Sequence, residues 1–174
     1  MSKGRIGIST TIPVEVVYAA GYTPVDLNNV FITSDDRGAL VAEAEFQGYP
    51  RNACGWIKGI YSTALRSELE AVIAVVEGDC SQTCAMMETL QMHGTHIIPF
   101  SFPYGRDRDL LRMQIDKLIG ALGTSWEKTL EWKHRLDALR RNPTGPAPTQ
   151  SMGAGDCSAA QQHRRTPRQA DAEA

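Results

Sequence analysis

Five consecutive apolar residues, Val72-Ile73-Ala74-Val75-Val76, lie near the middle of the chain. A strand with one face in water alternates apolar and polar residues, whereas a strand covered on both faces is apolar throughout. Strands of the second kind belong to parallel sheets packed between two layers of helices. The run therefore predicts a central strand of an α/β protein.

The segments around this run fit the same architecture. Shorter strand-like segments are predicted at residues 5–8, 22–27 and 96–100, and helical patterns at residues 13–20, 106–122 and 124–141. Strands that alternate with helices indicate a parallel sheet with helical crossovers. Because a proline cannot donate to a sheet ladder, Pro99 favours the end of a strand or an edge strand. The sequence thus predicts a Rossmann-like parallel sheet flanked by helices and followed by a C-terminal helix.

The composition changes sharply after Arg141. Residues 142–174 contain no Leu, Ile, Val, Phe, Trp or Tyr and are rich in Pro, Gln, Ala and Gly. Such a segment buries too little apolar surface to offset the entropy of ordering it. We therefore expect a folded domain over residues 1–141 and a disordered low-complexity tail over residues 142–174. A tail of this kind after a well-formed helix also suits a truncated or frameshifted gene.

The charge, the lengths of the apolar runs and the number of cysteines exclude several classes of function. The chain has 18 Lys and Arg against 20 Asp and Glu, a formal net charge of -2, which gives no basic surface for nucleic acid. No apolar run approaches the roughly 20 residues that span a bilayer, and the N-terminus lacks a signal-peptide core. The four cysteines are too few and too unevenly spaced for a secreted disulfide framework. We expect a cytoplasmic protein that binds neither nucleic acid nor a membrane, with its cysteines as thiols.

Two of the cysteines lie where α/β proteins bind ligands. Cys80 directly follows the predicted central strand and precedes a helical pattern, and Cys84 follows one helical turn later. Open α/β sheets bind ligands beyond the carboxyl ends of their strands, and the start of a helix favours an anionic group. A Cys-x3-Cys pair alone is a weak metal signal, so the alternative is that both are small buried apolar residues.

A third cysteine, Cys54, stands near the start of the helix before the central strand. Two nearby cations, Arg51 and Lys58, either contact an anion such as a phosphate or extend along the surface. Trp56 and Tyr61 are expected in the core.

Several motifs in order resemble the 2-hydroxyacyl-CoA dehydratase family, which includes the 2-hydroxyglutaryl-CoA dehydratase D-component and subunits of ATP-dependent benzoyl-CoA reductase. The resemblance covers residues 5–141. Its motifs are Thr10-Thr11-Ile12-Pro13-Val14-Glu15 with Tyr18-Ala19-Ala20-Gly21, Pro24-Val25-Asp26-Leu27-Asn28-Asn29, Pro50-Arg51-Asn52-Ala53-Cys54 and Gly78-Asp79-Cys80-Ser81.

The resemblance implies the cofactor and the chemistry. Cys54 and Cys80 match two cysteines that ligate a 4Fe-4S cluster in this family, and Glu15 matches the signature at the first helix. An ATP-dependent activator iron-sulfur protein supplies an electron to the cluster, which reduces the thioester of an acyl-CoA to a ketyl radical that expels a hydroxyl. The implied protein is a lyase component of anaerobic metabolism that works with a second dehydratase subunit or as a homo-oligomer.

The chain also departs from the family pattern. Family members are longer, with a second α/β lobe that supplies a further cluster cysteine. Cys84 is the candidate metal ligand that this chain offers in its place, and Cys157 is a less suitable one because it lies in the tail. Two other interpretations remain open: a non-catalytic remnant or partner-binding module, and a small redox or zinc protein built on Cys80 and Cys84.

The cluster hypothesis makes a geometric prediction. Two thiolates of one cubane need sulfur atoms on the order of 6 to 7 Å apart, from metal–sulfur bonds of about 2.3 Å and the width of the cluster. We therefore expect Cys54 and Cys80 to point into a common cavity, with Cys84 near or behind Cys80 and Cys157 remote.

Overall fold

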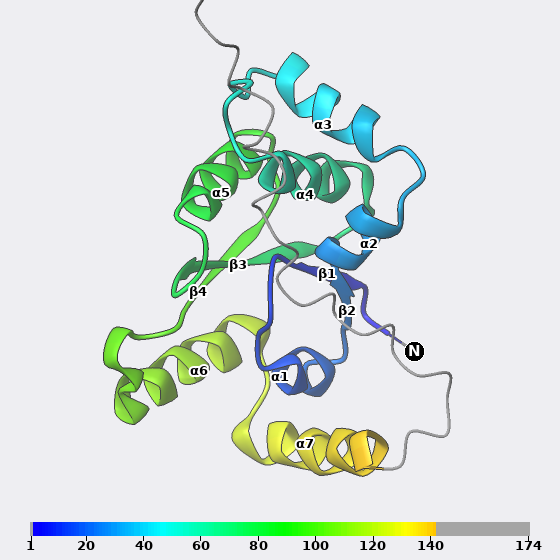
Figure 1. Cartoon of the computed structure of the whole chain (residues 1–174). Helices are drawn as coiled ribbons and strands as arrows, with labels where there is room; N and C mark the ends of the chain where they lie inside the picture. Colours follow the sequence, from blue (N-terminus) through cyan, green and yellow to red (C-terminus); the bar gives the residue numbers. More distant parts are fainter. Residues whose placement is uncertain (1, 142–174) are drawn as a thin grey trace, which may run out of the picture. The chain divides into compact units, whose positions relative to one another are not determined.

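The computed structural model describes residues 2–141, which form a parallel four-stranded sheet with helices on both faces (Figure 1). The predicted tail over residues 142–174, with Cys157, lies outside the described residues. One compact unit extends to Ala138.

The strands are β1 (Arg5–Ile8), β2 (Thr23–Asp26), β3 (Ala71–Glu77) and β4 (Ile97–Ser101), in the spatial order β2-β1-β3-β4. All three pairings are parallel. The apolar run forms β3, which pairs with β1 on one side and β4 on the other, so its predicted central position is confirmed. Pro99 lies on the edge strand β4, where its missing N–H costs no ladder bond on the open side.

The helices of the described residues are α1 (Val14–Ala19), α2 (Leu27–Thr33), α3 (Arg37–Phe46), α4 (Gly55–Arg66), α5 (Gln82–Met92), α6 (Arg108–Leu122) and α7 (Trp126–Arg141), with a short 3-10 turn at Tyr104–Arg106. The predicted helices at residues 13–20, 106–122 and 124–141 are confirmed within two residues at each end. Among the described residues, no helix is long and apolar enough to cross a membrane.

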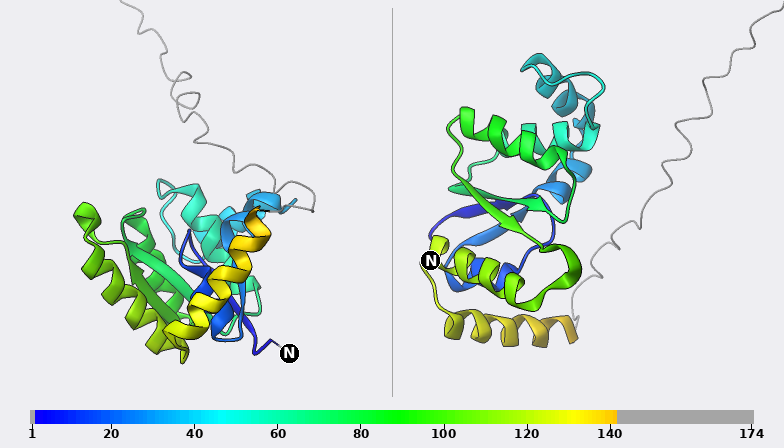
Figure 2. Two further views of the ribbon diagram at one scale, coloured as in Figure 1. Left: turned by 90° about the horizontal axis from the view of Figure 1, so that it is seen from below. Right: turned by 90° about the vertical axis from the view of Figure 1, so that its left-hand side faces the viewer.

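Alternate residues of β3 face two separate apolar cores. Ile73 and Val75 join residues of α1 and α6, whereas Val72 and Ala74 join residues of α4 and α5. All four side chains are fully buried. Figure 2 shows the two layers, with α1 and α6 on one side of the sheet and α4 and α5 on the other. The continuous apolar run thus reflects burial on both faces, as predicted.

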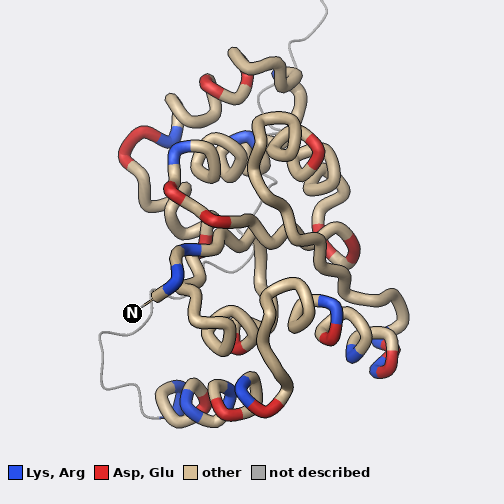
Figure 3. The backbone as a smooth tube through the Cα atoms, turned by 180° about the vertical axis from the view of Figure 1, so that it is seen from behind, with Lys and Arg blue, Asp and Glu red and all other residues tan. Residues whose placement is uncertain are grey.

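The tryptophans of α7 are packed within the chain. Trp132 stacks on Tyr18 of α1 with ring centroids 5.1 Å apart, and Trp126 donates from its indole N–H to Asp116 of α6. Acidic and basic residues are interleaved along α7 (Figure 3), and Lys133 pairs with Asp137 at 2.5 Å. Both tryptophans of α7 therefore have packing partners within the chain.

Candidate functional site

The loops that follow β1 and β3 meet at one edge of the sheet. The two strands are neighbours and run parallel, so their carboxyl ends open on the same side. Ser9, directly after β1, donates its N–H to Ile73 O at 3.2 Å and accepts from Val75 N at 3.2 Å through its hydroxyl. These bonds fix the β1 loop against β3, which carries the Cys80 segment.

A small cavity of about 210 Å³ lies at this edge. Residues from the carboxyl ends of β1 and β3 and from the starts of α2, α4 and α5 line it: Ser9, Thr10, Asn28, Trp56, Ile57, Ile60, Asp79, Cys80 and Thr83. Cys80 is exposed, and Thr83 is buried. The cavity therefore places one of the candidate cysteines beside hydroxyl, amide, carboxylate and indole groups.

Asn28 connects three segments at the cavity. Its Nδ2 donates to Ser9 O at 2.7 Å and to Asp26 Oδ1 at 3.2 Å, and its Oδ1 accepts from Trp56 Nε1 at 2.7 Å. The expectation that Trp56 is a core residue is wrong: the residue is 43% exposed, and its indole N–H donates to Asn28 at the cavity. Tyr61, in contrast, is fully buried, as expected.

Cys54 lies directly before the first residue of α4 and is half-buried, with its side chain against the core between the sheet and α4–α5. Its backbone N–H donates to Oε1 of Gln82, the first residue of α5, at 3.0 Å. Cys80 stands two residues before Gln82. The hydrogen bond thus joins the two cysteine-bearing segments, and a shared cavity for their sulfur atoms stays a prediction.

Cys84 lies in the first turn of α5 and is half-buried. Its thiol donates to Val76 O at a sulfur–oxygen distance of 3.6 Å. This directs the sulfur toward the backbone of β3. Among residues 2–141, no three or more His, Cys, Asp or Glu side chains are grouped so as to hold a metal ion.

Neither interpretation of Lys58 is correct. The residue is only 2% exposed, so it does not extend along the surface, and its ammonium is already paired inside the protein. Lys58 Nζ donates to Glu45 Oε1 at 2.6 Å and to Arg51 O at 3.2 Å. The hydrogen bond from Lys58 lowers the pKa of the Glu45 carboxyl below its ordinary value.

The fold and the site define a class: an α/β protein whose candidate site lies beyond the carboxyl ends of its parallel strands. A family model described as 2-hydroxyglutaryl-CoA dehydratase, D-component, matches residues 9–142. This range covers more than half of the chain, so the chain belongs to that family and is a 2-hydroxyacyl-CoA dehydratase-like subunit. The resemblance inferred from the motifs is confirmed. No curated protein matches the chain significantly.

Ser9, Thr83 and Gln82 were not singled out in the sequence, and Asn28 stands there only as part of a family motif, without a role. The sequence Pro24-Val25-Asp26-Leu27-Asn28 carries a usable signal, because a strand that ends at a helix-capping Asp places the next side chains at the sheet edge. Gln82 carries no such signal, because its bond to Cys54 spans 28 residues.

Proposed function

We propose that this chain is a 2-hydroxyacyl-CoA dehydratase-like subunit in which Cys54 and Cys80 hold part of a 4Fe-4S cluster. One observation carries the proposal: the Cys54 N–H to Gln82 Oε1 bond joins the starts of α4 and α5, before which the two cysteines stand. The family match over residues 9–142, which includes both cysteines, supports it.

The donor chemistry of this edge fits such a cluster in part. Iron-sulfur clusters are held by cysteine thiolates, and the starts of two helices favour the negative charge of a thiolate-ligated cluster. Residues 2–141 include three free thiols but no ready-made group of three ligands. Within this chain, Cys84 is the candidate for the third ligand. If Cys84 is not a ligand, a second lobe or subunit supplies the third one.

Bound at this place, the cluster would supply a low-potential electron, received from an ATP-dependent activator protein, to the thioester of an acyl-CoA. The residues of this chain hold and orient the reacting end of that substrate. The cavity of about 210 Å³ is smaller than the roughly 300–1,000 Å³ of typical small-molecule sites, so it accommodates the acyl end and not the whole CoA. The polar side chains that line it include Ser9, Thr10, Asp79 and Thr83. The Asn28 amide is already bonded to Ser9, Asp26 and Trp56.

Anaerobic metal analysis tests this function. The full chain, purified and reconstituted without oxygen, is expected to bind iron and sulfide and to show an EPR signal after reduction. Cys54→Ala and Cys80→Ala are each expected to lose that iron, whereas the matched variant Cys157→Ala keeps it. Cys84→Ala reports whether the third thiol is a ligand. A chain that binds no iron and keeps all its thiols free would contradict the proposal.

A further inference from the structure

The segment that carries Cys54 is held at several points. Residues 47–54 connect α3 to α4, and Tyr49 N–H donates back to Ala44 O at 3.0 Å. At the other end of the segment, the Cys54 N–H reaches Gln82. Between these two anchors, the side chain of Lys58 holds the segment from the inside.

Lys58 lies one helical turn after Cys54, and its own N–H donates to Cys54 O at 3.1 Å. Its side chain extends to Glu45 in the last turn of α3 and to the carbonyl oxygen of Arg51, three residues before Cys54. One ammonium therefore binds the helix that begins at Cys54, the helix before the loop and the loop itself.

The burial of Lys58 makes these contacts obligatory. Its side chain is 3% exposed, whereas that of Glu45 is 31% exposed. A buried ammonium without partners is costly, so the native position of Glu45 and of the Arg51 carbonyl is coupled to that of Lys58. A loop that moved away from the start of α4 would leave the ammonium without one of its two acceptors.

We propose that Lys58 is a positioning residue for Cys54: its ammonium fixes the 47–54 segment and so sets where the Cys54 thiol lies relative to α5. The consequence for a cluster rests on the proposed function, whereas the position of the thiol does not. Nothing in the proposed cluster chemistry requires Lys58 to touch the cofactor or the substrate.

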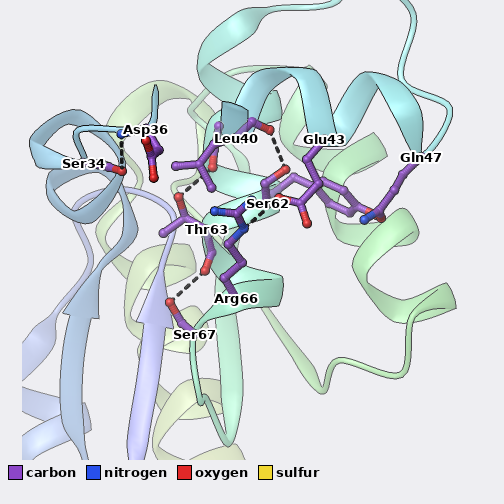
Figure 4. A network of polar contacts seen from close by, with 11 residues as sticks. Ser34, Asp36, Leu40, Glu43, Gln47, Ser62, Thr63, Arg66 and Ser67 are labelled. Atoms are coloured by element: carbon purple, nitrogen blue, oxygen red, sulfur yellow. Dashed lines mark hydrogen bonds and ion pairs between the residues drawn. The ribbon is translucent and has the colours of Figure 1, made fainter. Parts of the chain in front are cut away.

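The chain offers a matched control on the same pair of helices. Arg66 Nε pairs with Glu43 Oε2 at 2.8 Å and also joins α4 to α3 (Figure 4). This pair lies at the last residue of α4, away from the 47–54 segment, and the Arg66 side chain is 51% exposed. The Arg66→Met variant therefore removes an ion pair between α3 and α4 but keeps the contact of Lys58 with the Arg51 carbonyl.

The experiment uses the full chain with Lys58→Met, Lys58→Arg and Arg66→Met. Hydrogen exchange of residues 47–54 and the rate of alkylation of Cys54, both read by mass spectrometry, are the measurements. We expect Lys58→Met to raise both about tenfold or more, as the loss of hydrogen bonds to a charged group implies, with a much smaller change in β3. Lys58→Arg is expected to restore part of the protection, and Arg66→Met to leave it unchanged.

Unchanged exchange and alkylation in Lys58→Met would overturn the inference, as would an equal rise in β3, because that indicates general destabilisation. If Lys58→Met does not fold, Glu45→Gln takes its place, with a smaller rise expected in the same segment and the same contradicting outcomes. These readouts need no metal. A wild-type chain without iron would therefore contradict the proposed function alone, and an undisturbed segment in an iron-binding chain would contradict the role of Lys58 alone.

Discussion

The backbone N–H of Cys54 lies 3.0 Å from Oε1 of Gln82 and donates a hydrogen bond to it. Cys54 directly precedes α4, and Gln82 is the first residue of α5, the helix that follows Cys80. The position of one candidate ligand is therefore tied to the segment that carries the other. Changes in either segment are expected to affect both cysteines.

Gln82→Ala removes the acceptor of this bond. We expect faster hydrogen exchange of the Cys54 amide and a loss of about 1 kcal/mol in the free energy of unfolding, the usual contribution of one hydrogen bond. Gln91→Ala, also exposed and on the last turn of the same helix, is the control and should leave that amide unchanged. Equal exchange of the Cys54 amide in both variants would contradict the importance of the bond.

Gly59 is required for the contact of α4 with α2. A Cβ at this position would lie 2.2 Å from the ring of Phe31. The Phe31 ring in turn packs edge-on against the Trp56 ring, with the ring centroids 5.4 Å apart. Gly59→Ala is therefore expected to cost about 1–3 kcal/mol in denaturant unfolding and to change the fluorescence of the chain through Trp56. Gly55→Ala, on the same helix with open space around the new methyl, should be close to neutral. A neutral Gly59→Ala would show that Phe31 moves aside freely.

Asn28→Asp tests the side chain that connects the loops at the cavity. The aspartate keeps an acceptor for Trp56 but loses the donor to Ser9 O and places a second carboxylate beside Asp26. Asn29→Asp brings a carboxylate to the same Asp26, which Asn29 contacts at 2.9 Å, without touching Ser9. We expect Asn28→Asp to lower the free energy of unfolding by about 1–3 kcal/mol more than Asn29→Asp. Equal losses of stability would show that repulsion from the Asp26 carboxylate, and not the lost bond to Ser9 O, accounts for the destabilisation.

The pair of Lys58 and Glu45 predicts a loss of stability in acid. Lys58, and more weakly Arg51, lowers the pKa of the Glu45 carboxyl in the folded chain. A carboxyl with a lowered folded pKa stabilises the fold above its unfolded pKa, about 4.3, and this contribution is lost as the pH falls below that value. Chemical denaturation between pH 6 and about pH 3 should therefore show a shallower decline for Glu45→Gln than for the wild type. Parallel declines would contradict this role of Glu45.

The layered fold follows from local patterns in the sequence. The run in β3 is apolar at consecutive positions because helices cover both faces of the strand. The sequence pattern alone indicates this burial, even when the helices that cause it are not known. The same pattern places Cys80 beyond the carboxyl end of the central strand, where the structure also has it. The region between residues 27 and 46 was less informative, because α2 and α3 are only 7 and 10 residues long, shorter than the roughly 11–18 residues over which a helical apolar period is recognised.

The sequence by itself therefore determined the central strand, the three other strands, the helices at residues 13–20, 106–122 and 124–141, and the place of Cys80 at the sheet edge. Only the tertiary structure decided that Lys58 is buried against Glu45, that Trp56 stands at the cavity and that Gln82 binds Cys54. The physical reason is the range of the interactions. Burial on two faces imposes a pattern on neighbouring residues, whereas a polar or amphipathic side chain takes its place from partners 13 to 28 residues away. Such partners become neighbours only once the helices have packed.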